Sequence, residues 1–196
     1  MLCYGTPSCP NLCNERRMPR EKKSYTPDPR LEKNFPHLKD FFPFIHDLRS
    51  ESGRGAALLC CAYLDDLIRD TLAAFFVVGS ESDRLLEGFN APLGTFSARV
   101  TAAYACALIT EDEFSELNRL RKIRNEFAHS KTAAFTDQKI FDLCANLTYK
   151  APDTEGKTPR AAQPRFISAA VAIITSLANR PAYVRRERCG PKHWPR

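Results

Sequence analysis

The sequence predicts an all-α protein, a helical bundle with basic N- and C-terminal tails. Apolar residues recur at three- and four-residue steps in several segments of the 196-residue chain, the spacing that gives a helix one buried face. No segment shows the sustained two-residue alternation of a half-buried strand. With 43% hydrophobic and 27% charged residues, the composition is that of a globular protein, so the helices can share one core.

Two helices are predicted before residue 80. The first is a short helix from about residue 38 to residue 48, which Pro43 can bend. The second is long, and Gly79 and Ser80 end it. Its apolar stripe consists of Ala57, Leu58, Cys61, Leu64, Ile68, Leu72 and Phe75.

The middle of the chain contains a turn over residues 90–94, then a helix over about 96–107, then a capping box. Thr110 and Glu113 have the Thr-x-x-Glu spacing in which each side chain bonds the other residue's backbone N–H. The acidic residues at 111–113 complement the positive end of the helix that follows. The buried stripe of that helix is predicted to be Phe114, Leu117, Leu120, Ile123 and Phe127.

Two helices are predicted in the last third of the chain. Thr136 is expected to cap a helix that runs to about Leu147. Pro164 suits the first turn of the final helix, and Pro181 is expected to end it. Its stripe is predicted to be Phe166, Ile167, Ala170, Val171, Ile174 and Leu177.

The net charge of +6 belongs to the two ends of the chain, because residues 1–30 carry +3 and residues 180–196 carry +5. Residues 31–179 therefore carry −2, which argues against a domain that binds nucleic acid directly. The predicted organisation has five parts: a flexible basic tail over 1–33, a helical domain over 34–150, a linker or loop over 151–163, a closing amphipathic helix over 164–180, and a basic tail over 181–196. The C-terminal tail either binds nucleic acid unspecifically or serves solubility.

The sequence predicts no membrane span, because no apolar run reaches about 18 residues. Since the N-terminus also lacks the pattern of a signal peptide, we expect a cytoplasmic protein. The eight cysteines include no CxxC pair, so the spacing of known zinc sites is absent. We expect no metal and no cofactor. Four cysteines lie in apolar helical patterns and should be small buried hydrophobes: Cys60, Cys61, Cys106 and Cys144. A metal site of Cys3, Cys9 and Cys13 with His37 is the alternative.

Arg124, Asn125 and His129 are the candidate catalytic residues. An arginine grips phosphate with two donors, and a histidine titrates near neutral pH. Together they can cleave RNA without a metal, because the histidine moves a proton while the arginine stabilises the charged phosphorane.

The same spacing has a structural interpretation. Positions five apart on a regular helix differ by about 140°, so Arg124 and His129 do not share a face. His129 can simply complement the helix dipole, and Arg124 can pair with an acid such as Glu116 or Asp142. Arginines also precede His37 and His193 at similar spacings, so the spacing alone is not specific.

Residues 35–147 resemble the mannitol operon repressor family. The resemblance lies in residues 54–59 (RGAALL), 62–67 (AYLDDL), 91–99 (APLGTFSAR) and 124–129 (RNEFAH). The Arg-Asn-x-x-x-His pattern also resembles the signature of the HEPN superfamily, whose four-helix domains pair as dimers.

The resemblance implies two functions. The first is a transcriptional regulator that lacks its own DNA-binding domain and acts as a homodimer through protein partners, one of which could be a DNA-binding regulator. The alternative is a toxin-like, metal-independent HEPN endoribonuclease, in which Arg124 and His129 cleave RNA and Asn125 assists. Whether the protein is an enzyme stays open between these two.

Further interface or binding residues are predicted around this motif. Arg54 and Arg99 lie inside the family-like stretches, where they are either buried against a carboxylate or exposed at an interface. Arg121 is a candidate phosphate contact one turn before the motif, and Glu126 lies within it.

Overall fold

The computed structural model describes residues 25–26, 28–34, 39, 41–149, 162–190 and 192–195. These residues form helices joined by loops, with no strand among them, which confirms the predicted all-α bundle. The helices are α1 (Pro29–Asn34), α2 (Phe41–Ser50), α3 (Gly53–Phe75), α4 (Ser80–Leu86), α5 (Phe96–Ala105), α6 (Glu111–His129), α7 (Gln138–Ala145), α8 (Ala162–Leu177) and α9 (Arg180–Val184), followed by a 3-10 turn over Arg185–Glu187.

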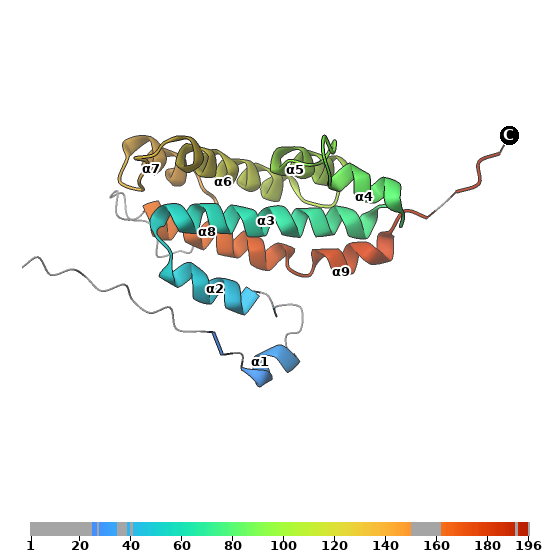
Figure 1. Ribbon diagram of the computed structural model, residues 1–196, viewed down its shortest axis with the longest axis horizontal. Helices are drawn as coiled ribbons and strands as arrows, with labels where there is room; N and C mark the ends of the chain where they lie inside the picture. Colours follow the sequence, from blue (N-terminus) through green and yellow to red (C-terminus); the bar gives the residue numbers. More distant parts are fainter. Residues whose placement is uncertain are drawn as a thin grey trace, which may run out of the picture.

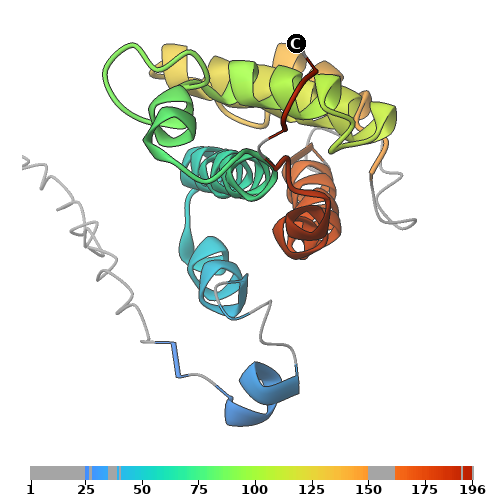
Figure 2. The ribbon, with the colours of Figure 1, turned by 90° about the vertical axis from the view of Figure 1, so that its right-hand side faces the viewer.

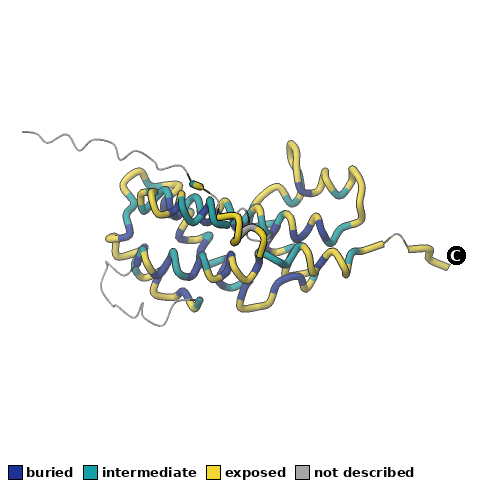
Figure 3. The backbone as a smooth tube through the Cα atoms, turned by 90° about the horizontal axis from the view of Figure 1, so that it is seen from below, coloured by how far each residue is buried: buried dark blue, intermediate teal, exposed yellow. Residues whose placement is uncertain are grey.

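Helix α3 is the centre of the bundle, and α5, α6, α8 and α9 all pack against it. The layer of α5, α6 and α7 lies on one side of α3 and α2 lies on the other, while α8 and α9 follow one another alongside α3 (Figures 1 and 2). Buried residues recur along the inward sides of these helices (Figure 3). The fully buried large side chains are Phe127, Phe166, Leu64, Ile68, Leu72, Leu117, Leu120, Ile123, Ile140, Leu147, Ile173 and Ile174.

Several element boundaries differ from the prediction. Asp137, not Thr136, precedes α7 as its N-cap residue. Pro181 does not end the last long helix: α8 already stops at Leu177, and the proline lies in the first turn of α9. A proline fits there because the first-turn N–H groups have no partner within the helix.

Three short helices, α1, α4 and α9, were not predicted. Helix α1 lies mostly within the predicted tail over 1–33, and α9 begins at Arg180 and covers the start of the predicted tail over 181–196. The chain after α9 also packs on the bundle: the Arg188 Nε donates to the Ala74 carbonyl at 2.9 Å, and the Cys189 N–H donates to the Phe75 carbonyl at 2.9 Å. Residues 188–189 therefore satisfy carbonyl groups at the C-terminus of α3.

No helix in the described part of the chain combines the length and the apolar character that crossing a bilayer requires.

Candidate functional site

The capping box positions α6, the helix that carries the Arg124–His129 motif. The Glu113 N–H donates to Thr110 Oγ1 at 3.2 Å, and the Thr110 N–H donates to Glu113 Oε2 at 2.9 Å, as predicted. Leu117, Leu120, Ile123 and Phe127 are fully buried, so the predicted stripe fixes the rotation of the helix. Phe114, the first residue of the predicted stripe, is only half-buried.

The three motif residues lie on the open surface of the last turns of α6. Arg124 and His129 are exposed and Asn125 is half-buried. Arg124 Nη1 donates to Asn125 Oδ1 at 3.2 Å. Neither Glu116 nor Asp142 pairs with Arg124, because Glu116 pairs with Arg119 and Asp142 accepts from Gln138.

Helix α6 continues to His129, so the motif stays helical throughout. Arg124 and His129 are therefore about 140° apart around the helix axis, whereas Asn125 and His129, four residues apart, lie on the same side. One copy of the chain does not bring the arginine and the histidine to a common point. A site that uses both needs groups from outside this helix.

Arg54 and Glu126 hold the end of α6 in place. The Arg54 guanidinium, from the first turn of α3, donates to the carbonyl of Ser130, the C-cap residue of α6. Glu126 forms an ion pair with Lys139 of α7 at 2.8 Å. These contacts tie the motif's end of α6 to two neighbouring helices.

Arg99 is buried against a carboxylate, which is one of the two placements that the sequence left open. It is 9% exposed, and its Nη1 contacts Asp65 Oδ1 at 2.8 Å. Arg121 is half-buried; its Nη2 donates to Asn118 at 3.3 Å, while its Nε is buried without a hydrogen-bond partner in the described structure. The Arg99 guanidinium is therefore used within the chain, whereas Arg121 pairs with no carboxylate in the described structure.

Two buried carboxylates of α6 organise the other half of the helix, and sequence reasoning did not single them out as a pair. Glu113 accepts from Arg180 Nη2 at 2.7 Å and from the Ser176 hydroxyl at 2.8 Å. Glu116, fully buried, accepts from the Thr148 N–H at 3.0 Å and the Tyr149 N–H at 3.0 Å. Each carboxylate fastens a distant segment of the chain to α6.

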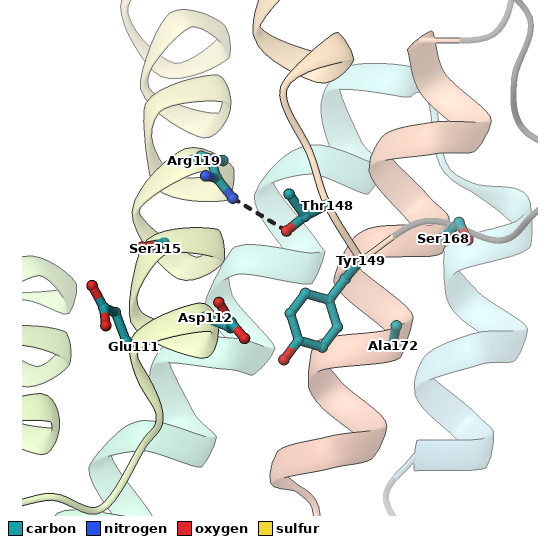
Figure 4. A pocket seen from close by; sticks show the side chains of 8 residues that line it. All are labelled: Glu111, Asp112, Ser115, Arg119, Thr148, Tyr149, Ser168 and Ala172. Carbon is teal, nitrogen blue, oxygen red and sulfur yellow. Dashed lines mark hydrogen bonds between the residues drawn. The ribbon is translucent and has the colours of Figure 1, made fainter.

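A cavity of about 650 Å³ lies beside this network, between α6 and α8 (Figure 4). Asp112, Ser115 and Arg119 line it from α6, and their spacing of three and four residues is the signal in the sequence that could have indicated a shared polar face. Its other walls come from Tyr149 and α8, which the sequence alone does not place there.

In the described part of the chain, no group of three histidine, cysteine or acidic side chains is placed to hold a metal ion. Cys3, Cys9, Cys13 and His37, the alternative metal ligands, lie outside the described residues.

No protein-family model matches the chain, and neither the curated proteins nor the solved structures contain a match.

Proposed function

We propose that the protein is a regulatory interaction protein, a homodimer that acts through protein partners and has no DNA-binding domain of its own. The observation that carries this proposal is the open placement of the motif at the end of α6. Small-molecule substrates are usually held in concave pockets, whereas Arg124 and His129 are exposed. An exposed, polar helix end suits contact with a macromolecule.

The contact surface of this proposal consists of Arg124, Asn125 and His129, which we call the α6 end. Arginine is enriched in protein interfaces because its planar group can bond and stack at once. The ties from Arg54 to Ser130 and from Lys139 to Glu126 hold this surface in one shape before a partner arrives. Such preorganisation lowers the entropy lost on association. A DNA-binding regulator is the partner class that the family resemblance suggests.

Sedimentation velocity tests the dimer. The wild type should sediment as a dimer at micromolar concentration, and Arg124→Glu should shift it to the monomer because it reverses a charge at the contact. Arg84→Glu is the matched control, since Arg84 is also an exposed arginine, on α4. A monomeric wild type, or equal effects of the two variants, would count against the α6 end as the contact.

A metal-independent endoribonuclease is the second candidate, and one observation favours it. Within the described structure, neither Arg124 nor His129 is neutralised by a carboxylate, so both are available to an anionic substrate. In a dimer, the arginine of one copy and the histidine of the other could flank one phosphate. The 2′-oxygen would then bond to phosphorus and the bond to the 5′-oxygen would break. The histidine would take the 2′-hydroxyl proton while water supplies the proton that the 5′-oxygen gains, or water would take the first proton while the histidine supplies the second.

RNA cleavage in the presence of a chelator tests this candidate. The wild type should cleave mixed RNA, His129→Ala should lose cleavage, and His193→Ala, which alters another exposed histidine, should retain it. Absence of cleavage by the wild type eliminates the ribonuclease. A wild-type dimer without cleavage leaves the regulatory proposal standing.

A further inference from the structure

The cavity between α6 and α8 has carboxylates at one end and, at the other end, the guanidinium of Arg119, which also pairs with the buried Glu116. Asp112 and Arg119 both line it from α6. They are seven positions apart, so they lie on the same side of the helix, about 10 Å apart along its axis. Figure 4 shows Asp112 beside the Tyr149 ring, and Arg119 beyond Ser115 at the other end. A ligand along this cavity meets a carboxylate first and a guanidinium two turns later.

Each charged end has bonding capacity left for a ligand. Asp112 is exposed and makes no ion pair in the described structure, and Glu111 beside it adds a second negative charge. Arg119 uses only its Nη1, which bonds Glu116 at 2.9 Å and Thr148 at 3.2 Å. Its Nη2 and Nε make no hydrogen bond to a described residue, so they remain for an anion.

The wall between the two ends is partly aromatic and is held in place. The Tyr149 ring lies between Asp112 and Ala172 (Figure 4). The Tyr149 N–H is bonded to the buried Glu116, which fixes this residue against α6. Burial, followed by the negative charges of Glu113, Asp112 and Glu116, raises the pKa of Tyr149, so the phenol stays protonated and can donate a hydrogen bond.

We propose that this cavity binds a short linear zwitterion, whose ammonium group bonds Asp112 and whose carboxylate bonds Arg119. Three residues of extended peptide span about 10 Å, which matches the separation of the two ends. The volume of about 650 Å³ is within the usual range for ligand pockets. The buried Glu116 accounts for one nitrogen of Arg119 and for the Tyr149 N–H, and it leaves the other guanidinium nitrogens and the phenol group for a ligand.

Isothermal titration with a matched set of ligands tests the proposal. Trialanine carries both charges, N-acetyl-trialanine lacks the ammonium, and trialanine amide lacks the carboxylate. We expect trialanine to bind, and each blocked form to bind about tenfold more weakly because one charge-assisted hydrogen bond is lost. 8-Aminooctanoate has the same two charges on an alkyl chain, so its affinity separates an ω-amino acid from a peptide as the ligand.

Variants assign each charge of the ligand to its end of the cavity. In Asp112→Asn, acetylation of trialanine should no longer weaken binding, and in Arg119→Gln, amidation should no longer do so. Asp83→Asn and Arg84→Gln, two exposed residues of α4, are matched controls that should keep the wild-type pattern. If circular dichroism shows that Arg119→Gln is unfolded, the affinities of the wild type for free and blocked trialanine still test whether both charges of the ligand are bound. No binding by either zwitterion at millimolar concentration, or equal binding of free and blocked peptides, overturns the proposal.

Discussion

Arg99 of α5 contacts Asp65 of α3 across 2.8 Å, in a part of the bundle where both side chains are largely covered. The same guanidinium donates to the Leu93 carbonyl at 2.8 Å and to the Leu86 carbonyl at 2.9 Å. One side chain therefore joins α3, α5 and both ends of the loop between α4 and α5. Leu93 and Arg99, both within residues 91–99, are part of this junction.

Arg99→Met should strongly destabilise the fold. It keeps most of the side-chain volume but leaves Asp65 and two carbonyl groups without their donor. Loss of one partner of a fully buried pair costs about 3–5 kcal/mol, and this pair, in which Asp65 is 29% exposed, should lie at or below the lower end of that range. Urea unfolding followed by circular dichroism measures the change. Arg84→Met, which removes a largely exposed ion pair with Glu81, should cost no more than about 1 kcal/mol. Similar losses in the two variants would show that Arg99 does not brace the bundle.

Glu113 should make the stability of the protein depend on acid pH. Burial by itself raises the pKa of Glu113, but bonds from the Thr110 N–H, the Ser176 hydroxyl and Arg180 bring it below its ordinary value of 4.5. A carboxyl whose pKa is lower in the folded state stabilises the fold above its unfolded pKa, and this stabilisation disappears as the pH falls through the folded pKa.

The measurement compares wild type with Glu113→Gln. Below about pH 5, the free energy of unfolding should fall more steeply with decreasing pH for the wild type than for the variant, which has no carboxyl to protonate at this position. Denaturant titrations at a series of acid pH values give both slopes. Parallel slopes would contradict the assignment.

The buried cysteines should not react in the folded protein. Burial raises the pKa of Cys60 and of Cys144 to about 12 each and also raises that of Cys61, so these thiols stay protonated and covered. The exposed Cys189 is the internal comparison. After iodoacetamide treatment at about pH 8, mass spectrometry should find Cys189 modified and the other three unmodified. In denaturant all four should react, and modification of Cys60 at the rate of Cys189 would argue against the packing of α3.

Removal of the Arg54 side chain should loosen the last turn of α6. Arg54→Ala takes away the donor to the Ser130 carbonyl, while the core stripe of α6 remains. Hydrogen exchange in a peptide that covers residues 124–132 should therefore speed up by roughly tenfold, with no change in peptides from α8. Lys122→Ala, an exposed substitution on α6, is the control. Equal exchange in Arg54→Ala and wild type would show that this contact does not hold the α6 end.

The features that sequence reasoning predicted are those encoded within a few residues. The Thr110–Glu113 capping box spans four positions, and the stripe ending at Phe127 repeats within one helix, so both could be recognised locally. Helices α4 and α9 each bury a single residue, Leu86 and Val184, so they carry no apolar stripe to recognise. Their formation depends on packing against α3.

In the candidate sites, too, local features could be predicted from the sequence, whereas contacts between distant segments could not. The motif residues Arg124 and His129 could be named from the sequence, and their place on α6 follows from helix periodicity. The partner of Arg99 could not be identified, because Asp65 is 34 positions away and only the tertiary fold brings it near. The cavity likewise combines Arg119, Tyr149 and Ala172 from three separate segments.

The central place of α3 has a consequence for how the protein is made. Residues 76–161 separate α3 from α8, so ribosomes translate most of the chain before α8 and α9 exist. Until then the apolar surface that α8 and α9 cover is open to water and to other chains, a state prone to aggregation. A polypeptide that terminates within residues 150–161 keeps this surface uncovered permanently, which makes such a fragment a target for chaperones and proteases.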